Sequence, residues 1–202
     1  MADSRVRGRT RRGVFAGVLV AGLAVSALLL VAVSRGALAA SFAVSGTSFK
    51  ISADRLEGTG FVQFGGVDGG PEGAHAVSPS AFRTVVLDNF CQSASLRSLP
   101  VVGDVTLRIA SPGEGGMSAT DIVLGVAEQR GDLTLLNPQI GVDAGQVSKG
   151  PPGVVGPPGG FGQQADRATI VAPRIEAWSA AASTLRLKNS LLTLHNGGGE
   201  CY

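Results

Sequence analysis

The N-terminal part of the chain joins a cluster of positive charges to a long apolar run. Arginines occupy positions 5, 7, 9, 11 and 12, and no charged residue lies between Gly13 and Val33. An apolar run of about 20 residues can span a bilayer as a helix, whereas the core of a cleavable signal peptide usually has ~7 to 15 residues. The sequence therefore predicts a basic cytoplasmic segment over 1–12 and a transmembrane helix or signal peptide over 13–40.

A cleavage pattern ends this segment. Ala37 and Leu38 precede Ala39 and Ala40, and this is the small-residue pattern that a signal peptidase reads, so Ala39 and Ala40 mark the alternative in which the segment is removed. The arginines should stay cytoplasmic under the positive-inside rule. Both alternatives place 41–202 outside the cytoplasmic membrane, either in a single-pass membrane protein or in a secreted one.

The positive net charge of the whole chain comes from residues 1–40. Residues 1–40 hold six of the 17 Lys and Arg residues and one of the 15 Asp and Glu residues, which leaves 11 basic and 14 acidic side chains and a net charge of −3 in 41–202. Binding to nucleic acid needs a concentrated basic surface. We therefore expect no nucleic-acid partner, and we expect 41–202 to form a single domain.

Two cysteines, Cys91 and Cys201, remain in the part predicted to be exported. An even number of cysteines outside the cytoplasm favours a disulfide over two independent thiols. Such a bridge would close a loop of about 110 residues and constrain the unfolded chain by roughly 4 to 5 kcal/mol in the chain-entropy model. Neither cysteine has a second cysteine or a histidine at a metal-ligand spacing, so no metal and no cofactor are expected.

Apolar residues alternate with small and polar ones beyond residue 41, which is the period of strands. Strands are predicted over the ranges 83–89, 103–109, 121–127, 132–136, 168–171 and 184–195. Many short strands separated by glycine, proline and asparagine turns fit a mostly β domain. The sequence leaves open whether this domain is a sandwich, a curved sheet or a solenoid.

Three segments depart from the strand pattern. The alanines over 175–182 make a short helix conceivable. Glycines and prolines over 150–160 predict a solvated extended loop that separates two parts of one sheet. A second flexible loop is predicted over 65–79, and it carries His75 as a solvated histidine.

One pair of residues offers a catalytic hypothesis. Ser118 lies in Gly116-Met117-Ser118-Ala119-Thr120, in which threonine replaces the last glycine of the G-x-S-x-G nucleophile elbow, and His195 follows it as hydrolase order requires. The alternative for His195 is an ordinary cross-strand polar contact, because serine, aspartate and histidine occur in this order in most chains of similar size. We expect a protein without catalytic residues; if it is an enzyme, it is a serine ester hydrolase.

The aromatic side chains indicate that the protein can bind an apolar ligand. Seven of the eight phenylalanines and the one tryptophan, Trp178, lie beyond residue 41; they will mostly form the core, but they can also line an apolar pocket. A sheet whose apolar face is partly uncovered can hold an acyl chain. The sequence therefore predicts a membrane setting with a lipid or a membrane protein as partner.

Several runs of the chain resemble an uncharacterised family of actinomycete envelope proteins. They are GALAASFAVSG at 36–46, GTGFVQFGGVD at 58–68, LPVVGDVTLR at 99–108, GFGQQAD at 160–166 and ECY at 200–202. The resemblance implies an N-terminal membrane segment, a β-rich outer domain and the two cysteines. Some members carry a cholesterol esterase label.

Two functions follow from these observations. The first is a non-enzymatic cell-envelope protein, anchored or secreted, that binds a lipid or a membrane partner. The alternative is a secreted lipid or sterol ester hydrolase that uses Ser118 and His195.

Overall fold

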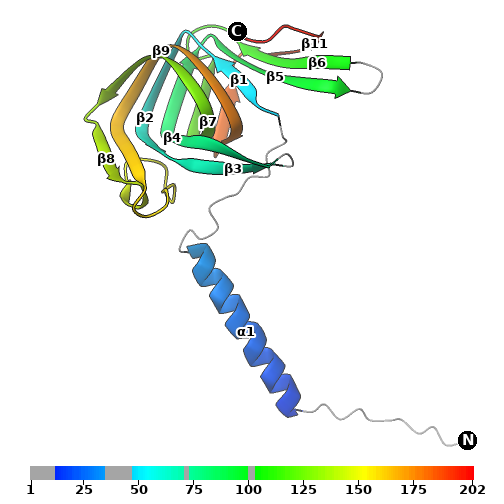
Figure 1. Ribbon diagram of the computed structural model, residues 1–202, viewed down its shortest axis with the longest axis vertical. Coiled ribbons are helices and arrows are strands. Elements are labelled where there is room, and N and C mark those ends of the chain that lie inside the picture. Colours follow the sequence, from blue (N-terminus) through cyan, green and yellow to red (C-terminus); the bar gives the residue numbers. More distant parts are fainter. Residues whose placement is uncertain (1–11, 35–46, 71–72, 100–102) are drawn as a thin grey trace, which may run out of the picture. The chain divides into compact units, whose positions relative to one another are not determined.

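The computed structural model describes residues 12–34, 47–70, 73–99 and 103–202, and it divides into two units, 1–41 and 42–202. In the first unit, helix α1 spans Arg12–Ser34 (Figure 1), and its sequence does not confine the apolar residues to one stripe. In the part of the chain that the structure describes, no helix is both long and apolar enough to cross a membrane. Ala39 and Ala40 lie outside the described residues.

The second unit is mostly β, as predicted, and its strands are antiparallel (Figure 1). Its described residues form eleven strands: β1 (Phe49–Ser52), β2 (Arg55–Phe64), β3 (Gly66–Gly70), β4 (Gly73–Asp88), β5 (Phe90–Leu99), β6 (Gly103–Ser111), β7 (Met117–Leu136), β8 (Gln139–Asp143), β9 (Phe161–Ala181), β10 (Thr184–Leu187) and β11 (Leu191–Asn196). The order of hydrogen-bonded neighbours is β10-β7-β4-β2-β9-β1-β5-β6-β11, with β3 beside β4 and β8 beside β9.

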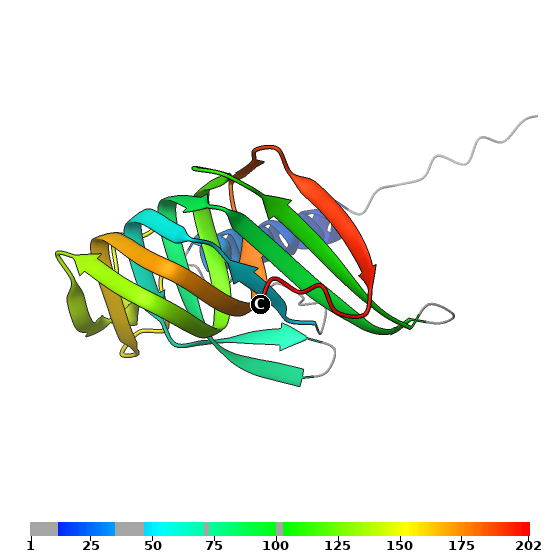
Figure 2. The ribbon, with the colours of Figure 1, turned by 90° about the horizontal axis from the view of Figure 1, so that it is seen from above.

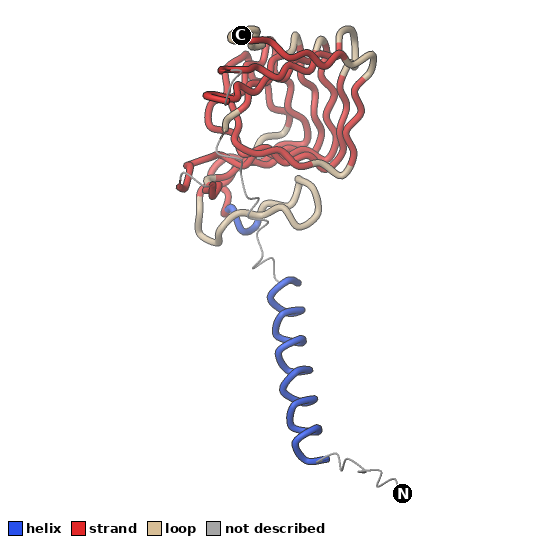
Figure 3. Tube along the Cα trace, turned by 90° about the vertical axis from the view of Figure 1, so that its right-hand side faces the viewer, coloured by secondary structure: helices blue, strands red, loops and turns tan. Residues whose placement is uncertain are grey.

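Four of these strands close a ring of pairings. β2 pairs with β4, β4 with β7, β7 with β9, and β9 with β2 again. The sheet therefore curls strongly, as the tube in Figure 3 shows. Of the three architectures that the sequence left open, the structure has the curved sheet.

Local irregularities let the long strands of the ring bend. The β7–β9 ladder changes register at three places, between Gly125 and Val126, between Val126 and Glu128, and between Arg130 and Asp132. An extra residue on one strand sharpens the bend and the twist. Gly131 sits in the last of these shifts with a φ of +131°, a conformation that favours glycine.

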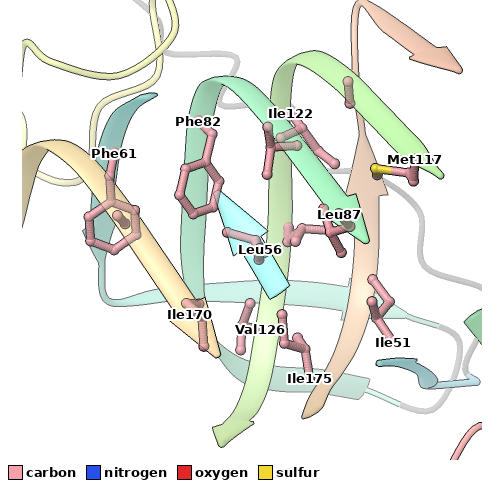
Figure 4. Close-up of a cluster of buried hydrophobic side chains, with 14 of the residues drawn as sticks. Ile51, Leu56, Phe61, Phe82, Leu87, Met117, Ile122, Val126, Ile170 and Ile175 are labelled. Carbon is pink, nitrogen blue, oxygen red and sulfur yellow. The ribbon is translucent and has the colours of Figure 1, made fainter. Parts of the chain in front are cut away.

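The main core fills the inside of the curl (Figure 4). Phe61 of β2 and Phe82 of β4 lie with their ring centroids 5.2 Å apart. Gly58 leaves the room for this arrangement, because a Cβ atom there would lie 2.2 Å from Cδ1 of Phe82. Inward-facing aliphatic side chains of β1, β2, β7 and β9 complete the core.

A second, smaller cluster lies against β2 and β4. Val62, Phe64 and Ala81 pack with Ala144 and Val147 from the segment after β8. The amide of Gln164 holds this segment, since its Oε1 accepts hydrogen bonds from the backbone N–H groups of Ser148 and Lys149 at 2.8 and 3.0 Å.

Two predictions about local structure are wrong. The range 175–182 is not a helix, because all but its last residue belongs to β9 and pairs with or bulges against β7. The range 65–79 is a hairpin of β3 and β4 instead of a flexible loop. The segment 150–160 is a loop, as predicted; its first residues, Gly150 and Pro151, are buried, and the rest is exposed or partly exposed.

Strand boundaries also differ from those expected. The two strands predicted over 121–127 and 132–136 are one strand, β7, because the ladder with β9 continues through the register shifts. The single strand predicted over 184–195 is divided into β10 and β11, which pair with β7 and β6.

The fit around Gly58 gives a testable prediction. Replacing Gly58 by Ala forces the Phe82 ring to move, so the free energy of unfolding should fall by about 1–3 kcal/mol. Gly65→Ala is the matched control, because nothing lies within 4 Å of a Cβ atom at that position. Urea unfolding of both variants measures the difference. Equal stability of the two variants would contradict the packing described here.

Candidate functional site

The apolar inner face of the ring continues onto a flap formed by β5, β6 and β11, which Figure 2 shows to one side of the ring. Directly opposed residues of antiparallel strands point to the same face. One row across β9, β1, β5, β6 and β11 contains Ile175, Ile51, Gln92, Ile109 and Leu192. The next row contains Ala177, Phe49, Ala94, Leu107 and Leu194.

Burial falls steadily along both rows. Ile175 is 2% and Ile51 5% exposed, whereas Leu192 and Leu194 at the far end are 61% and 66% exposed. Leu107 and Ile109 between them are partly buried. A third row on the same face contains Leu96, Val105 and Asn196. We call the outer part of these three rows the open face, and its exposed or partly buried apolar side chains are Ala94, Leu96, Leu107, Ile109, Leu192 and Leu194.

The opposite face of the flap is polar. There Ser93 and Ser95 of β5 lie beside Arg108 and Thr106 of β6. The C-terminal segment 197–202, here called the strap, crosses this face. Ser93 and Thr106 are each only 2% exposed, so polar side chains are buried on this side of the flap.

Covalent and polar contacts fasten the strap. Cys201 forms a disulfide with Cys91, with a Cα–Cα distance of 5.8 Å, which confirms the predicted bridge. The backbone N–H of Cys201 donates to Oγ of Ser93 at 3.0 Å, and Oγ of Ser95 donates to Glu200 at 2.8 Å. The ammonium group of Lys50 lies 2.5 Å from the Glu200 carboxylate.

The terminal residue adds an aromatic contact. The ring of Tyr202 faces the Lys50 ammonium at 5.3 Å and the Arg174 guanidinium at 5.5 Å, within cation–π range. Burial, and then the negative charges of Glu176 and Glu128, raise the pKa of the Tyr202 phenol. The phenol therefore stays neutral to a higher pH than that of a free tyrosine.

The interior of the ring has little free space. A cavity of about 20 Å³ lies among apolar side chains, which include Ile51, Phe82, Met117 and Ile175. This volume is close to the minimum that a single water molecule needs. An acyl chain therefore does not fit in this cavity.

The structure places Ser118 and His195 on separate strands, β7 and β11. By the pairings of the sheet, β9, β1, β5 and β6 lie between them. Ser118 is half-buried opposite Val86. His195 shares a hydrogen bond of 3.0 Å with Thr193, and a Cβ atom on Gly199 of the strap would lie 2.8 Å from its ring. The strand order does not bring the two residues together.

His75 differs from its prediction as a solvated loop histidine. Its ring stacks on that of Trp178 with the centroids 3.6 Å apart, and its Nε2 atom is buried. Beside them, Oγ of Ser179 donates to Asp68 at 2.6 Å. Trp178 is the residue skipped where the β7–β9 register shifts. No local sequence signal marks such a bulge, so the contact could not be predicted.

Metal binding has no support among the residues that the structure describes. Within them, no three His, Cys, Asp or Glu side chains lie close enough together to hold an ion.

Comparison with known proteins gives one match. Residues 45–202 match the model of a family described as a family of unknown function, DUF6230. No curated protein and no solved structure matches the chain.

The contribution of the disulfide to stability can be tested. Cys201→Ser should lower the free energy of unfolding by about 2–4 kcal/mol, because the unfolded chain is no longer cross-linked and the strap loses its covalent attachment. Urea unfolding under non-reducing conditions measures this loss.

A double variant is the control. Cys91→Ser with Cys201→Ser should be as unstable as the single variant, since the same bridge is lost in both. A single variant as stable as the unchanged protein would contradict the role assigned to the strap.

Proposed function

The chain belongs to the DUF6230 family of unknown function, and we propose that it is a non-enzymatic cell-envelope protein, anchored or secreted, that binds lipid on its open face. The observation that carries this proposal is the continuous apolar surface that runs from the core to the exposed Leu192 and Leu194. Contiguous exposed apolar patches on soluble domains commonly mark interaction sites.

The sequence of the N-terminal unit supports the envelope location. A helix whose apolar residues are not confined to one stripe is suited to an apolar surrounding rather than to water. The arginines before it orient such a segment with its C-terminal side outward. A disulfide between Cys91 and Cys201 also suits an oxidising compartment outside the cytoplasm.

The length of the connection favours lipid as the ligand. If the segment over 13–40 is retained as an anchor, residues 35–48 connect it to Phe49 and can span at most about 50 Å when fully extended. Phe49 belongs to one of the two rows that lead to the open face. The anchor would thus keep the second unit within reach of the bilayer, where acyl chains are the abundant apolar ligand.

The shape of the open face suits an extended acyl chain. Its rows cross β1, β5, β6 and β11, which at about 4.8 Å per strand spacing is about 15 Å. Only Gln92 and Asn196 interrupt the apolar side chains of these rows. Covering an exposed leucine stabilises a complex by about 1.5–3 kcal/mol.

Leu192 and Leu194 test this proposal. Replacing both by Gln should reduce the amount of co-purifying lipid at least about tenfold, because two leucine contacts of the ligand are lost. Leu191→Gln is the matched control: Leu191 is 61% exposed like Leu192 but points to the opposite face. Mass spectrometry of organic extracts of the purified proteins measures the lipid. Equal lipid content in all three proteins would disprove the assignment.

The non-enzymatic part of the proposal has its own test. The purified protein should not hydrolyse chromogenic acyl or sterol esters, because the strand order separates Ser118 from His195. An ester assay of the unchanged protein and of Ser118→Ala measures this. Turnover that disappears in Ser118→Ala would overturn the proposal and establish the hydrolase instead.

A further inference from the structure

A polar groove lies on the side of the sheet away from the core. Its volume is about 680 Å³, which is within the range of small-molecule sites. Residues of β2, β4 and β9 line it together with Gly115 and Lys188. In contrast to the open face, its lining is rich in charged and hydroxyl side chains.

Some charges of the groove are already paired within the protein. Arg55 lies 2.6 Å from the carboxylate of Glu57. Asp88 accepts a hydrogen bond of 2.6 Å from the backbone N–H of Gly115. The charges of Arg55 and Glu57 largely cancel. Asp88 keeps its negative charge, because a backbone N–H group does not neutralise a carboxylate.

Two cations of the groove, Arg167 and Lys188, form no ion pair or hydrogen bond through their side chains with any residue that the structure describes. Arg167 lies opposite Thr59 across the β2–β9 ladder. The ammonium group of Lys188 would lie 3.1 Å from a Cβ atom on Gly115, beside Val86 of β4. Lys188 follows β10, which lies four strands from the β9 strand of Arg167, but its ammonium group reaches back to β4. β4 is two strand spacings, or about 10 Å, from β9. The long Arg167 side chain can extend into this gap.

Hydroxyl groups lie between these cations. Thr59 and Thr84 face each other across β2 and β4 with their Oγ1 atoms 2.6 Å apart. One of these hydroxyls donates to the other, and the pair can donate its second hydrogen to a ligand, from either Thr59 or Thr84. Glu114 is the one carboxylate of the groove without a partner in the described residues, and it disfavours ligands that carry many negative charges.

We propose that this groove binds a single phosphate group, with Arg167 and Lys188 as its cations and the paired hydroxyls of Thr59 and Thr84 as a donor. Guanidinium groups bind phosphate oxygens through paired hydrogen bonds, and ammonium groups add a point charge. The site is independent of the open face, because the two lie on opposite sides of the sheet. Lipid headgroups and soluble phosphate esters share this chemistry.

Phosphate titrations of the full chain, in an uncharged detergent, test the proposal. Inorganic phosphate and glycerol phosphate are the soluble probes, and calorimetry measures the dissociation constant. Arg167→Gln and Lys188→Gln should each raise this constant at least about tenfold. Thr59→Val should weaken binding less, since a neutral donor contributes less than a charged one.

Arg130→Gln is the control, because Arg130 is exposed, pairs with Glu128 and lies outside the groove. It should bind phosphate as the unchanged protein does. Circular dichroism shows whether each variant is folded. Absence of binding at millimolar phosphate, unchanged binding in both groove variants, or an equal loss in Arg130→Gln would each overturn the proposal.

A second experiment separates the two sources of phosphate. Vesicles of phosphatidylcholine with and without phosphatidylglycerol are compared with glycerol phosphate. Tighter binding to phosphatidylglycerol vesicles that is lost in Lys188→Gln supports a headgroup, and tighter binding to glycerol phosphate supports a soluble ester. Lipid binding on the open face contributes to the binding of both kinds of vesicle, so the difference between them reports on the groove alone. Failure of this site and failure of lipid binding on the open face can therefore be distinguished.

Discussion

The fold depends on the pairing of β9 along both of its edges. Residues 162–171 and 174–177 pair with β2 and β1 on one edge, while β8 and β7 pair along the other. Since β7 also reaches β2 through β4, the sheet must curl into a ring. β2 and β1 pair with successive parts of the same edge of β9. The position of β2 therefore determines that of β4, and the position of β1 determines that of β5.

This arrangement divides the sheet into a ring and a flap at one seam. β2 leads to β4 within the ring, whereas β1 leads to β5, β6 and β11 in the flap. Asn89 joins the turns at the seam: its Nδ2 donates to Asp54 at 2.5 Å and its Oδ1 accepts from Gly113 N at 2.7 Å. Its φ of +50° is a conformation that asparagine tolerates better than most residues. One side chain therefore links the three turns from which the flap departs.

The sequence predicted the mostly β character and the disulfide, because alternation and cysteine count are local or compositional signals. It did not predict the ring, the open face or the groove. Ile51 and Leu192 share a row only through the pairings of four strands, and Arg167 and Lys188 meet at one groove only because the sheet curls. The alternating residues of 191–196 indicate that β11 has two different faces. The sequence alone does not indicate which of these faces is continuous with the apolar core.

The strap explains why the two faces of the flap differ in their relation to solvent. Polar side chains usually remain exposed, yet Ser93 is buried here, because Cys201 and Glu200 cover it and satisfy its neighbours. On the other face, leucines at 61% and 66% exposure have no such cover among the described residues. The strap covers the polar face, where its hydrogen bonds replace those that water would make. The apolar face of the flap is not covered by any segment that the structure describes. This asymmetry supports the proposal that an apolar ligand covers the open face.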